Sequence, residues 1–136
     1  MQVPAFLLRR LYVRGSLHND GDGFAFELKN SLGSGYAEQM LPLTVDGEPI
    51  PPEDATFAVE GSGTALPFNA VSSEQPFTLS MRKTVAIAVR GRTLVPGKHK
   101  IGMGFVVTGM GTMRFDVTDV IEDAPARTES DLDAVS

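Results

Sequence analysis

Four segments of this chain alternate between apolar residues and polar or small ones with a period of two. They span residues 23–30, 84–90, 98–108 and 112–121, and the first of them places Phe24, Phe26 and Leu28 at every second position. Because successive side chains of a strand point to opposite faces, this alternation is typical of a strand with one buried face. The pattern therefore predicts four half-buried strands.

Glycine and proline separate these segments and supply the chemistry of their turns. Asp46-Gly47 lies between two short apolar runs, where glycine accepts the positive φ of a tight hairpin. Gly109-Met110-Gly111 joins the last two alternating segments and predicts a second hairpin. Pro96-Gly97 lies immediately before a strand, and it is typical of a corner that carries the chain from one sheet to the other.

The sequence predicts an all-β fold, a two-sheet antiparallel β-sandwich of the immunoglobulin-like or jelly-roll-like kind with about 7–8 strands. A closed barrel is the alternative. Weaker patterns predict the remaining strands at residues 10–18, 40–45, 55–60 and 77–80. Residues 49–54 form a linker, because the prolines in it block helix and sheet ladder alike. Residues 64–76 have room for one helical turn at most.

Negative charge gathers at the C-terminal end. The net charge of the 136 residues is −5, and residues 122–136 hold five acids against Arg127 alone, a net charge of −4. We expect one β-sandwich domain over residues 1–121 and an acidic tail over 122–136. The tail is either a solvated end or an arm that orders on a partner through Leu132 and Val135. The rest shows no basic face, which predicts no nucleic-acid partner.

The composition also bears on location. The chain has no cysteine, which excludes disulfides, thiolate metal sites and cysteine nucleophiles. The apolar patch at residues 3–8 precedes its arginines, the reverse of a secretory signal. No stretch approaches the ~20 apolar residues that span a bilayer. These features predict a cytoplasmic protein with no membrane association.

Two histidines, His18 and His99, are the candidates for catalysis or metal binding. His18 lies near Asp20 and Asp22, but neighbouring residues at a strand end point to alternating faces, so a polar turn is the simpler interpretation. His99 follows the Pro-Gly corner, where we expect a structural histidine. Even together, the two histidines would give one ligand fewer than a typical catalytic zinc site. The sequence thus predicts no catalytic residue, no metal site and no cofactor bound by this chain.

The glycine motifs carry no catalytic signature either. Gly33-Ser34-Gly35 and Gly61-Ser62-Gly63 lack the helix and partner base of a serine nucleophile. Gly102 and Gly104 lie in a β-hairpin context, whereas nucleotide-binding glycine loops lie in a βαβ unit. We expect the glycines at 102, 104, 109 and 111 at turn and close-packing positions.

Apolar residues in apparent loops are the remaining unusual feature. They either close the core at the ends of the sandwich or form a docking patch, since methionine and aromatic side chains are enriched at interfaces. The second interpretation predicts that a partner chain contacts Tyr36, Met40, Phe68, Phe77 and Met110.

Four motifs follow one another in an order that is familiar from one family. They are Gly23-Phe24-Ala25-Phe26, LTVDGEPIPPED at residues 43–54, LVPGKHKI at residues 94–101 and MRFDVTD at residues 113–119. In this order, over residues 11–121, the chain resembles the small (β) subunit of bacterial C-glycoside deglycosidases. Residues 30–36 (NSLGSGY) depart from that family, which has an aromatic and basic segment there. The resemblance is therefore to a divergent relative.

The resemblance implies a heteromeric lyase of carbohydrate metabolism. Its larger subunit is similar to the TIM-barrel sugar isomerases and epimerases, and would hold a divalent metal, manganese or a similar ion. Loss of the C2 proton from a 3-oxo-glycoside would give a metal-stabilised enolate, which expels the group at C1 by β-elimination. The present chain would be a non-catalytic small subunit that supports and completes the active site of the barrel.

Two other hypotheses stay open. A stand-alone carbohydrate- or protein-binding β-sandwich would need no partner, but the chain has no Trp and only Tyr12 and Tyr36 for stacking on sugar rings. An independent enzyme that uses His18 and His99 is the third hypothesis.

Overall fold

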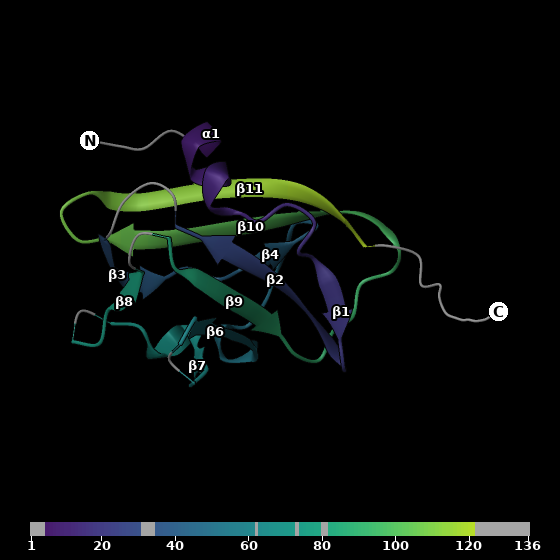
Figure 1. Ribbon diagram of the computed structural model, residues 1–136, viewed down its shortest axis with the longest axis horizontal. Coiled ribbons are helices and arrows are strands. Elements are labelled where there is room, and N and C mark those ends of the chain that lie inside the picture. The colour runs from purple at the N-terminus through teal and green to yellow at the C-terminus, as the bar shows by residue number, and fades with distance from the viewer. Residues whose placement is uncertain (1–4, 31–34, 62, 73, 80–81, 122–136) are drawn as a thin grey trace.

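The computed structural model describes residues 5–30, 35–61, 63–72, 74–79 and 82–121. Within them the chain folds into two antiparallel sheets that lie face to face (Figure 1). One sheet has the strand order β1-β2-β9-β6-β7, and the other has the order β5-β4-β10-β3-β8 with β11 paired to β10. The predicted all-β, two-sheet antiparallel sandwich is confirmed.

The described residues contain eleven strands, so the predicted count of seven or eight is wrong. The first sheet comprises β1 (His18–Asp20), β2 (Gly23–Lys29), β6 (Ala55–Val59), β7 (Leu66–Pro67) and β9 (Thr84–Val89). The second comprises β3 (Gly35–Met40), β4 (Thr44–Val45), β5 (Glu48–Pro49), β8 (Phe77–Leu79), β10 (Gly97–Val107) and β11 (Gly111–Ile121). The short helices are α1 (Ala5–Leu8), η1 (Arg9–Leu11), η2 (Pro52–Asp54) and η3 (Phe68–Ala70).

The strongly alternating segments form the strands predicted for them. In β11 every second residue from Met113 to Ile121 is buried, and β10 pairs with β11 along its whole length, from Gly97↔Ile121 to Val107↔Gly111. The two largest buried side chains of β2, Phe24 and Phe26, are each 1% exposed. Burial of one face on the facing sheet explains why the period of two predicted these strands.

The predicted turns are also confirmed. Asp46 and Gly47 join β4 to β5 with φ of 53° and 87°, the left-handed region that a two-residue hairpin needs. Met110 lies at the tip of the β10–β11 hairpin, where its N–H donates to the carbonyl of Val107. Pro96-Gly97 carries the chain from β9 in one sheet to β10 in the other.

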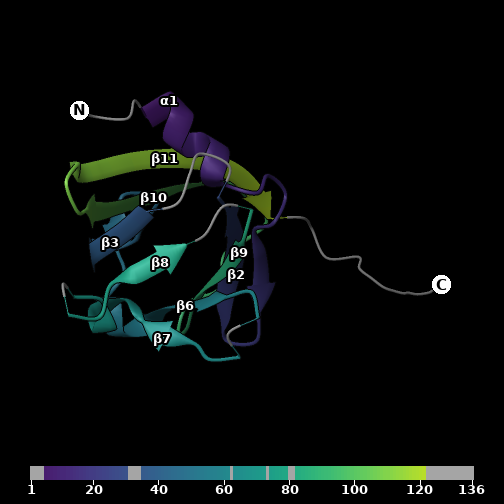
Figure 2. The ribbon, with the colours of Figure 1, turned by 60° about the vertical axis from the view of Figure 1, so that its left-hand side comes forward.

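The N-terminal segment differs from the strand predicted at residues 10–18. Residues 5–11 form α1 and η1, and only His18–Asp20 forms a strand, although Tyr12 makes an isolated bridge to Leu28. Leu8, Leu11 and Tyr12 are all buried, and their spacing of three and four positions is the helical one. Figure 2 shows this segment over β11. It covers an edge strand of the second sheet, a common protection against edge pairing.

The segment 40–45, predicted as one strand, contains the last residue of β3 and the whole of β4. Both strands pair with the same edge of β10. The register of β3 on β10 gives Met40↔Phe105, whereas that of β4 gives Val45↔Ile101. Pro42 lies in the interruption, and it has no N–H to donate to the ladder. β3 itself escaped prediction because residues 35–40 show no apolar alternation.

Two segments predicted as irregular contain short elements. The linker expected at 49–54 begins with the last residue of β5 and contains η2. The segment 64–76 contains β7 and the single turn η3. The predicted tail, residues 122–136, lies outside the described residues. No helix in the described part of the chain is long and apolar enough to cross a membrane.

Two glycines of β10 and one of β2 are explained by close contacts. A Cβ at Gly102 would clash with Oγ1 of Thr44, and one at Gly104 would lie 2.8 Å from Cδ1 of Leu41. A Cβ at Gly23 would clash with the carbonyl oxygen of Val89. The prediction that the glycines of β10 serve close packing is confirmed for Gly102 and Gly104.

Candidate functional site

His99 lies on β10 and is only 7% exposed. Its Nδ1 is 2.7 Å from Oδ2 of Asp46, and its Nε2 is 2.7 Å from the carbonyl oxygen of Val95. Burial opposes charging of the ring, but the bonds to Asp46 and Val95 prevail and hold the pKa of His99 above its usual value. With both nitrogens occupied, His99 has no lone pair for a metal or for a substrate proton in this arrangement.

Asp46 is held as firmly as its partner. Its Oδ1 accepts from the backbone N–H of Lys100 at 2.9 Å, and its own N–H donates to the Lys100 carbonyl at 2.8 Å. The hydrogen bond from Lys100, followed by that from His99, holds the pKa of Asp46 below its usual value. The carboxylate therefore joins the β4–β5 turn to β10.

Asp119 on β11 is a buried carboxylate, 7% exposed. Its Oδ2 accepts from the Tyr12 hydroxyl at 2.6 Å and from the Gly15 N–H at 2.9 Å, and its Oδ1 accepts from the Val120 N–H at 2.8 Å. Burial alone would raise the pKa of Asp119, but these hydrogen bonds hold it below its usual value. Burial, and then the bond to Asp119, raise the pKa of Tyr12. A phenol that is so hard to ionise is a structural donor here.

The structure does not bring the two histidines into one site. His18 is on β1 in the first sheet, with its Nδ1 2.7 Å from the carbonyl oxygen of Ser16, and His99 is on β10 in the second sheet. Among the residues that the structure describes, no three His, Asp or Glu side chains gather in a way that could hold a metal ion.

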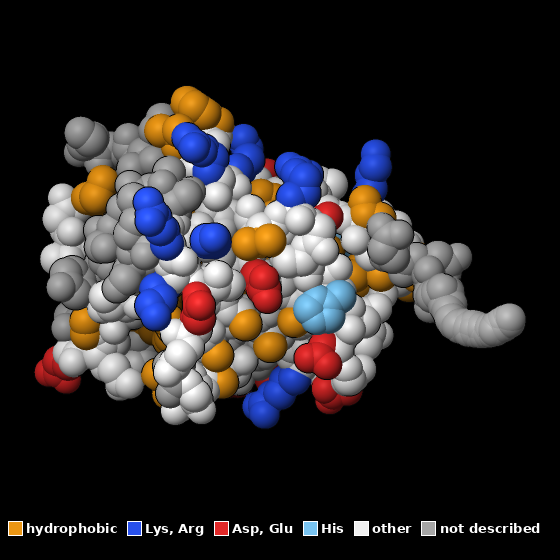
Figure 3. Space-filling view, in the orientation of Figure 1, with side chains coloured by type: hydrophobic (Ala, Val, Ile, Leu, Met, Phe, Trp, Pro, Cys, Tyr) orange, Lys and Arg blue, Asp and Glu red, His pale blue; other side chains and the backbone are white. Residues whose placement is uncertain are grey.

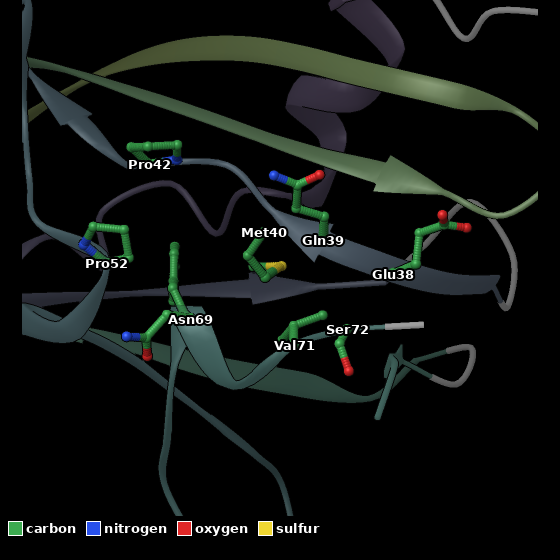
Figure 4. A pocket seen from close by; sticks show the side chains of 9 residues that line it. Glu38, Gln39, Met40, Pro42, Pro52, Asn69, Val71 and Ser72 are labelled. Carbon is green, nitrogen blue, oxygen red and sulfur yellow. The ribbon is translucent and has the colours of Figure 1, made fainter. Parts of the chain in front are cut away.

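A cleft opens on the side of the sandwich where Pro42 interrupts the β3–β4 edge. It has a volume of about 500 Å³ and is lined by Glu38, Gln39, Met40, Pro42, Pro52, Phe68, Asn69, Val71 and Ser72. Figure 4 shows Met40 and Val71 directed into the space between β3 and the η3 segment, while the amides of Gln39 and Asn69 are directed away from it. The cleft thus has an apolar interior and a polar rim.

The predicted interface residues are distributed unevenly around this cleft. Met40 and Phe68 line it and are 5% and 1% exposed, so they belong to the core as well. Phe77 is half-buried and packs edge-on against Phe57, with ring centroids 4.8 Å apart. Met110 is 36% exposed at the hairpin tip. The side chain of Tyr36 lies outside the described residues. Their role as an interface stays a prediction.

Charge is distributed unevenly over the surface that Figure 3 shows. Lys and Arg side chains lie mainly in the upper part of that face, over the N-terminal segment and β11, and acidic side chains lie mainly below them. The guanidinium of Arg9 donates to the Asp116 carbonyl at 2.7 Å and so joins η1 to β11. The prediction that the chain has no nucleic-acid partner stays untested.

The extent of the β-sandwich coincides with that of a known family. The model of the hydroxymethylglutaryl-CoA reductase N-terminal domain matches residues 7–122, from α1 to the end of β11. The chain belongs to this family. Among curated proteins, none matches the chain.

Membership of the reductase N-terminal domain family overturns the resemblance drawn from the sequence. The chain is not identified with the small subunit of C-glycoside deglycosidases, and the lyase function and the carbohydrate-metabolism role that followed from it are wrong. The alternative, a stand-alone carbohydrate- or protein-binding module, gains no support from the match either. The motifs behind the resemblance were mostly turns: Asp46-Gly47 and Pro96-Gly97 are needed by many sandwiches, so they do not discriminate between families.

Sequence reasoning also missed the side-chain partners of His99 and Asp119, the buried polar residues of β10 and β11. Asp46 was interpreted only as a turn residue, and Asp119 only as the end of a motif. For Asp119 a signal was available, because it occupies a position that the alternation predicts to be buried. A buried carboxylate needs hydrogen-bond donors from other segments. Nothing local in the sequence pointed from Asp46 to His99.

Proposed function

We propose that this chain is an accessory domain of a hydroxymethylglutaryl-CoA reductase system and contacts the catalytic part of the reductase through the cleft between β3 and η3. The observation that carries this proposal is the family match, which spans residues 7–122 and therefore the whole sandwich. A match of that extent concerns a complete structural unit, whereas a short motif would concern one site.

The anatomy of the cleft favours contact with another protein surface. Met40, Phe68 and Val71 are buried, whereas Gln39 and Asn69 are exposed at the rim. An apolar centre surrounded by polar groups is the arrangement of protein interfaces, where the rim excludes water from the central contacts.

The same cleft does not fit the CoA part of the substrate. Coenzyme A carries phosphates, which proteins bind with Arg, Lys or the N-terminus of a helix. Glu38 is the charged residue among the nine that line the cleft, and it is acidic. Its Oε2 accepts from the Thr108 hydroxyl at 3.0 Å. Repulsion from this carboxylate would disfavour a phosphate, so we assign the cleft to docking and not to substrate binding.

The ionisable groups with side-chain hydrogen bonds support an accessory role. Side-chain hydrogen bonds hold segments of this chain together in two pairs, His99 with Asp46 and Tyr12 with Asp119. Groups held in this way contribute to stability and domain shape rather than to proton transfer.

Two sequence-based expectations are retained as proposals. We propose that the chain works in the cytoplasm and that its sandwich is of the immunoglobulin-like or jelly-roll-like class. The barrel-type partner subunit and its divalent metal were implied by the deglycosidase resemblance, and they stay untested predictions that the docking proposal does not need.

Docking can be tested with the complete chain and the catalytic domain of a hydroxymethylglutaryl-CoA reductase from the same organism. We expect light scattering to show a complex on gel filtration, with a dissociation constant of about 10 μM or lower by calorimetry. The variant Asn69→Trp adds an indole to the exposed rim, and we expect it to weaken binding at least about tenfold, since a bulky side chain there blocks close approach.

Thr118→Trp is the matched control, because Thr118 is also exposed but lies on β11. It should bind like the unmodified chain. Absence of a complex would overturn the accessory role, whereas equal weakening by both variants would leave the partner in place and refute the cleft as the docking site.

A further inference from the structure

The hydrogen bonds of His99 define a charge state. Asp46 Oδ2 and the Val95 carbonyl oxygen are both acceptors, so a ring that bonds to both must donate from both nitrogens. Only the doubly protonated, positively charged imidazolium has two N–H groups. The geometry at 2.7 Å on each side is therefore that of a buried imidazolium.

The two acceptors belong to segments that are held with different strength. Asp46 keeps two further backbone hydrogen bonds to Lys100. Val95 lies in the connection between β9 and β10, residues 90–96, which we call the crossover loop. Val95 is 71% exposed, so its side chain contributes little packing. The bond from His99 to its carbonyl is thus a main restraint at this end of the loop.

Other contacts hold the start and the middle of the crossover loop. Arg92 Nη1 is 2.6 Å from Oε1 of Glu48. Leu94 N donates to Asn19 Oδ1 at 2.8 Å, and Asn19 Nδ2 donates to the Leu94 carbonyl at 2.8 Å. None of these groups is a histidine, so near neutral pH they keep the loop attached while the bond to Val95 is made or lost.

We propose that the protonation state of His99 controls the crossover loop: the imidazolium holds the carbonyl of Val95 against β10, and deprotonation releases it. A neutral ring has one N–H. It remains on Nδ1, because the Asp46 carboxylate is a stronger acceptor than a carbonyl. The lone pair of Nε2 then faces the lone pairs of the Val95 carbonyl, and that repulsion drives the 95–96 end of the loop away from β10.

The charges that face His99 determine where this change occurs. Asp46 stabilises the imidazolium, whereas Arg92 and burial disfavour it. On β10, Lys98 and Lys100 flank His99 in sequence, and on β11 Asp119 is its register partner. Asp119 is itself committed to Tyr12 and Gly15. The net effect is a raised pKa, which places the release above the usual titration range of histidine.

The experiment is an NMR titration of the unmodified chain between pH 5 and 9. We expect the His99 ring to titrate above the usual range of histidine, the ring to be the Nδ1–H tautomer once neutral, and the backbone signals of Val95 and Gly97 to shift with the same midpoint. The protection of the Leu94 amide from hydrogen exchange, corrected for intrinsic rates, should stay the same across that midpoint, because its bond to Asn19 is not released.

Two variants separate release of the loop from general loss of structure. In His99→Gln the loop signals should no longer change with pH, because the side chain does not titrate. In Asp46→Asn, which tolerates the positive φ of this turn, the midpoint should move down. A His99 that is neutral throughout, an Nε2–H tautomer, or loop signals that are unchanged across the His99 titration would each overturn the proposal.

Discussion

His99 and Asp119 are register partners on β10 and β11, and both are 7% exposed in an otherwise apolar face. They nevertheless connect different segments. His99 binds the β4–β5 turn and the crossover loop, whereas Asp119 binds the segment that follows η1 through Tyr12 and Gly15. His99 donates hydrogen bonds and is stabilised by the carboxylate of Asp46, whereas Asp119 accepts hydrogen bonds from neutral donors.

The difference shows how a buried polar residue can join parts of a fold that are remote in sequence. Tyr12 and Asp119 are 107 positions apart, and Asp46 and His99 are 53 positions apart. A buried group without partners costs about 1–3 kcal/mol, so each residue requires its distant segment to be in place. The predictions below run from the largest expected effect to the smallest.

Removing Asp119 should destabilise the domain more than removing His99. Asp119→Ala leaves the buried Tyr12 hydroxyl and the Gly15 N–H without an acceptor, at a cost of about 3 kcal/mol. His99→Ala leaves acceptors at Asp46 and Val95, which lie closer to solvent, at a cost of about 2 kcal/mol. Urea unfolding of both variants gives the two free energies, and the reverse order would contradict the comparison.

The two residues should also give opposite pH dependence. The pKa of Asp119 is lowered from 3.8 by folding, so its contribution is present above that value and is lost as pH falls through the folded pKa. The pKa of His99 is raised from 6.5, so its contribution is complete below that value and is lost as pH rises through the folded pKa.

Unfolding free energies measured across pH 2–9 test these signs. Asp119→Asn should flatten the acid limb of the profile and leave the alkaline limb, whereas His99→Gln should flatten the limb above neutrality. Some acid dependence should remain in Asp119→Asn, because the pKa of Asp46 is lowered as well. If either variant flattened the opposite limb, the assigned charge states would be wrong.

Tyr12→Phe isolates a single donor of the Asp119 network. The ring stays in the core next to Phe26, at a centroid distance of 5.6 Å, while the bond to Asp119 is lost. We expect a loss of about 1 kcal/mol in the free energy of unfolding, since Gly15 and Val120 still donate to the carboxylate. A loss as large as that of Asp119→Ala would show that Tyr12 carries the whole network.

Arg92→Ala should have the smallest effect on stability. Its ion pair with Glu48 is at the surface, and such pairs contribute about 0–1 kcal/mol. Because Arg92 disfavours the imidazolium, its removal should raise the pKa of His99 in an NMR titration. An unchanged or lowered pKa would show that Arg92 does not act on His99.

The strands β2, β9, β10 and β11 could be predicted, because the local alternation of apolar and polar residues indicates that one face of each strand is buried. The helix at the N-terminus was missed although Leu8, Leu11 and Tyr12 have helical spacing, because the apolar run around them also fits a strand. β3 was missed because its central position comes from pairing with β10 and β8 and not from its own residues. Of the cleft, sequence reasoning picked out Met40 and Phe68 as exceptional apolar residues, but not the rim.

By itself, the sequence determined the all-β class, the long strands and the turns at Asp46-Gly47, Pro96-Gly97 and Gly109–Gly111. These depend on side-chain periodicity and on the φ that single residues accept, which are local properties. The tertiary structure alone decided that His99 meets Asp46, that Asp119 meets Tyr12, and that a cleft opens beside Pro42. Those features arise when strands distant in sequence pack together, and no local pattern encodes which buried polar group will face which.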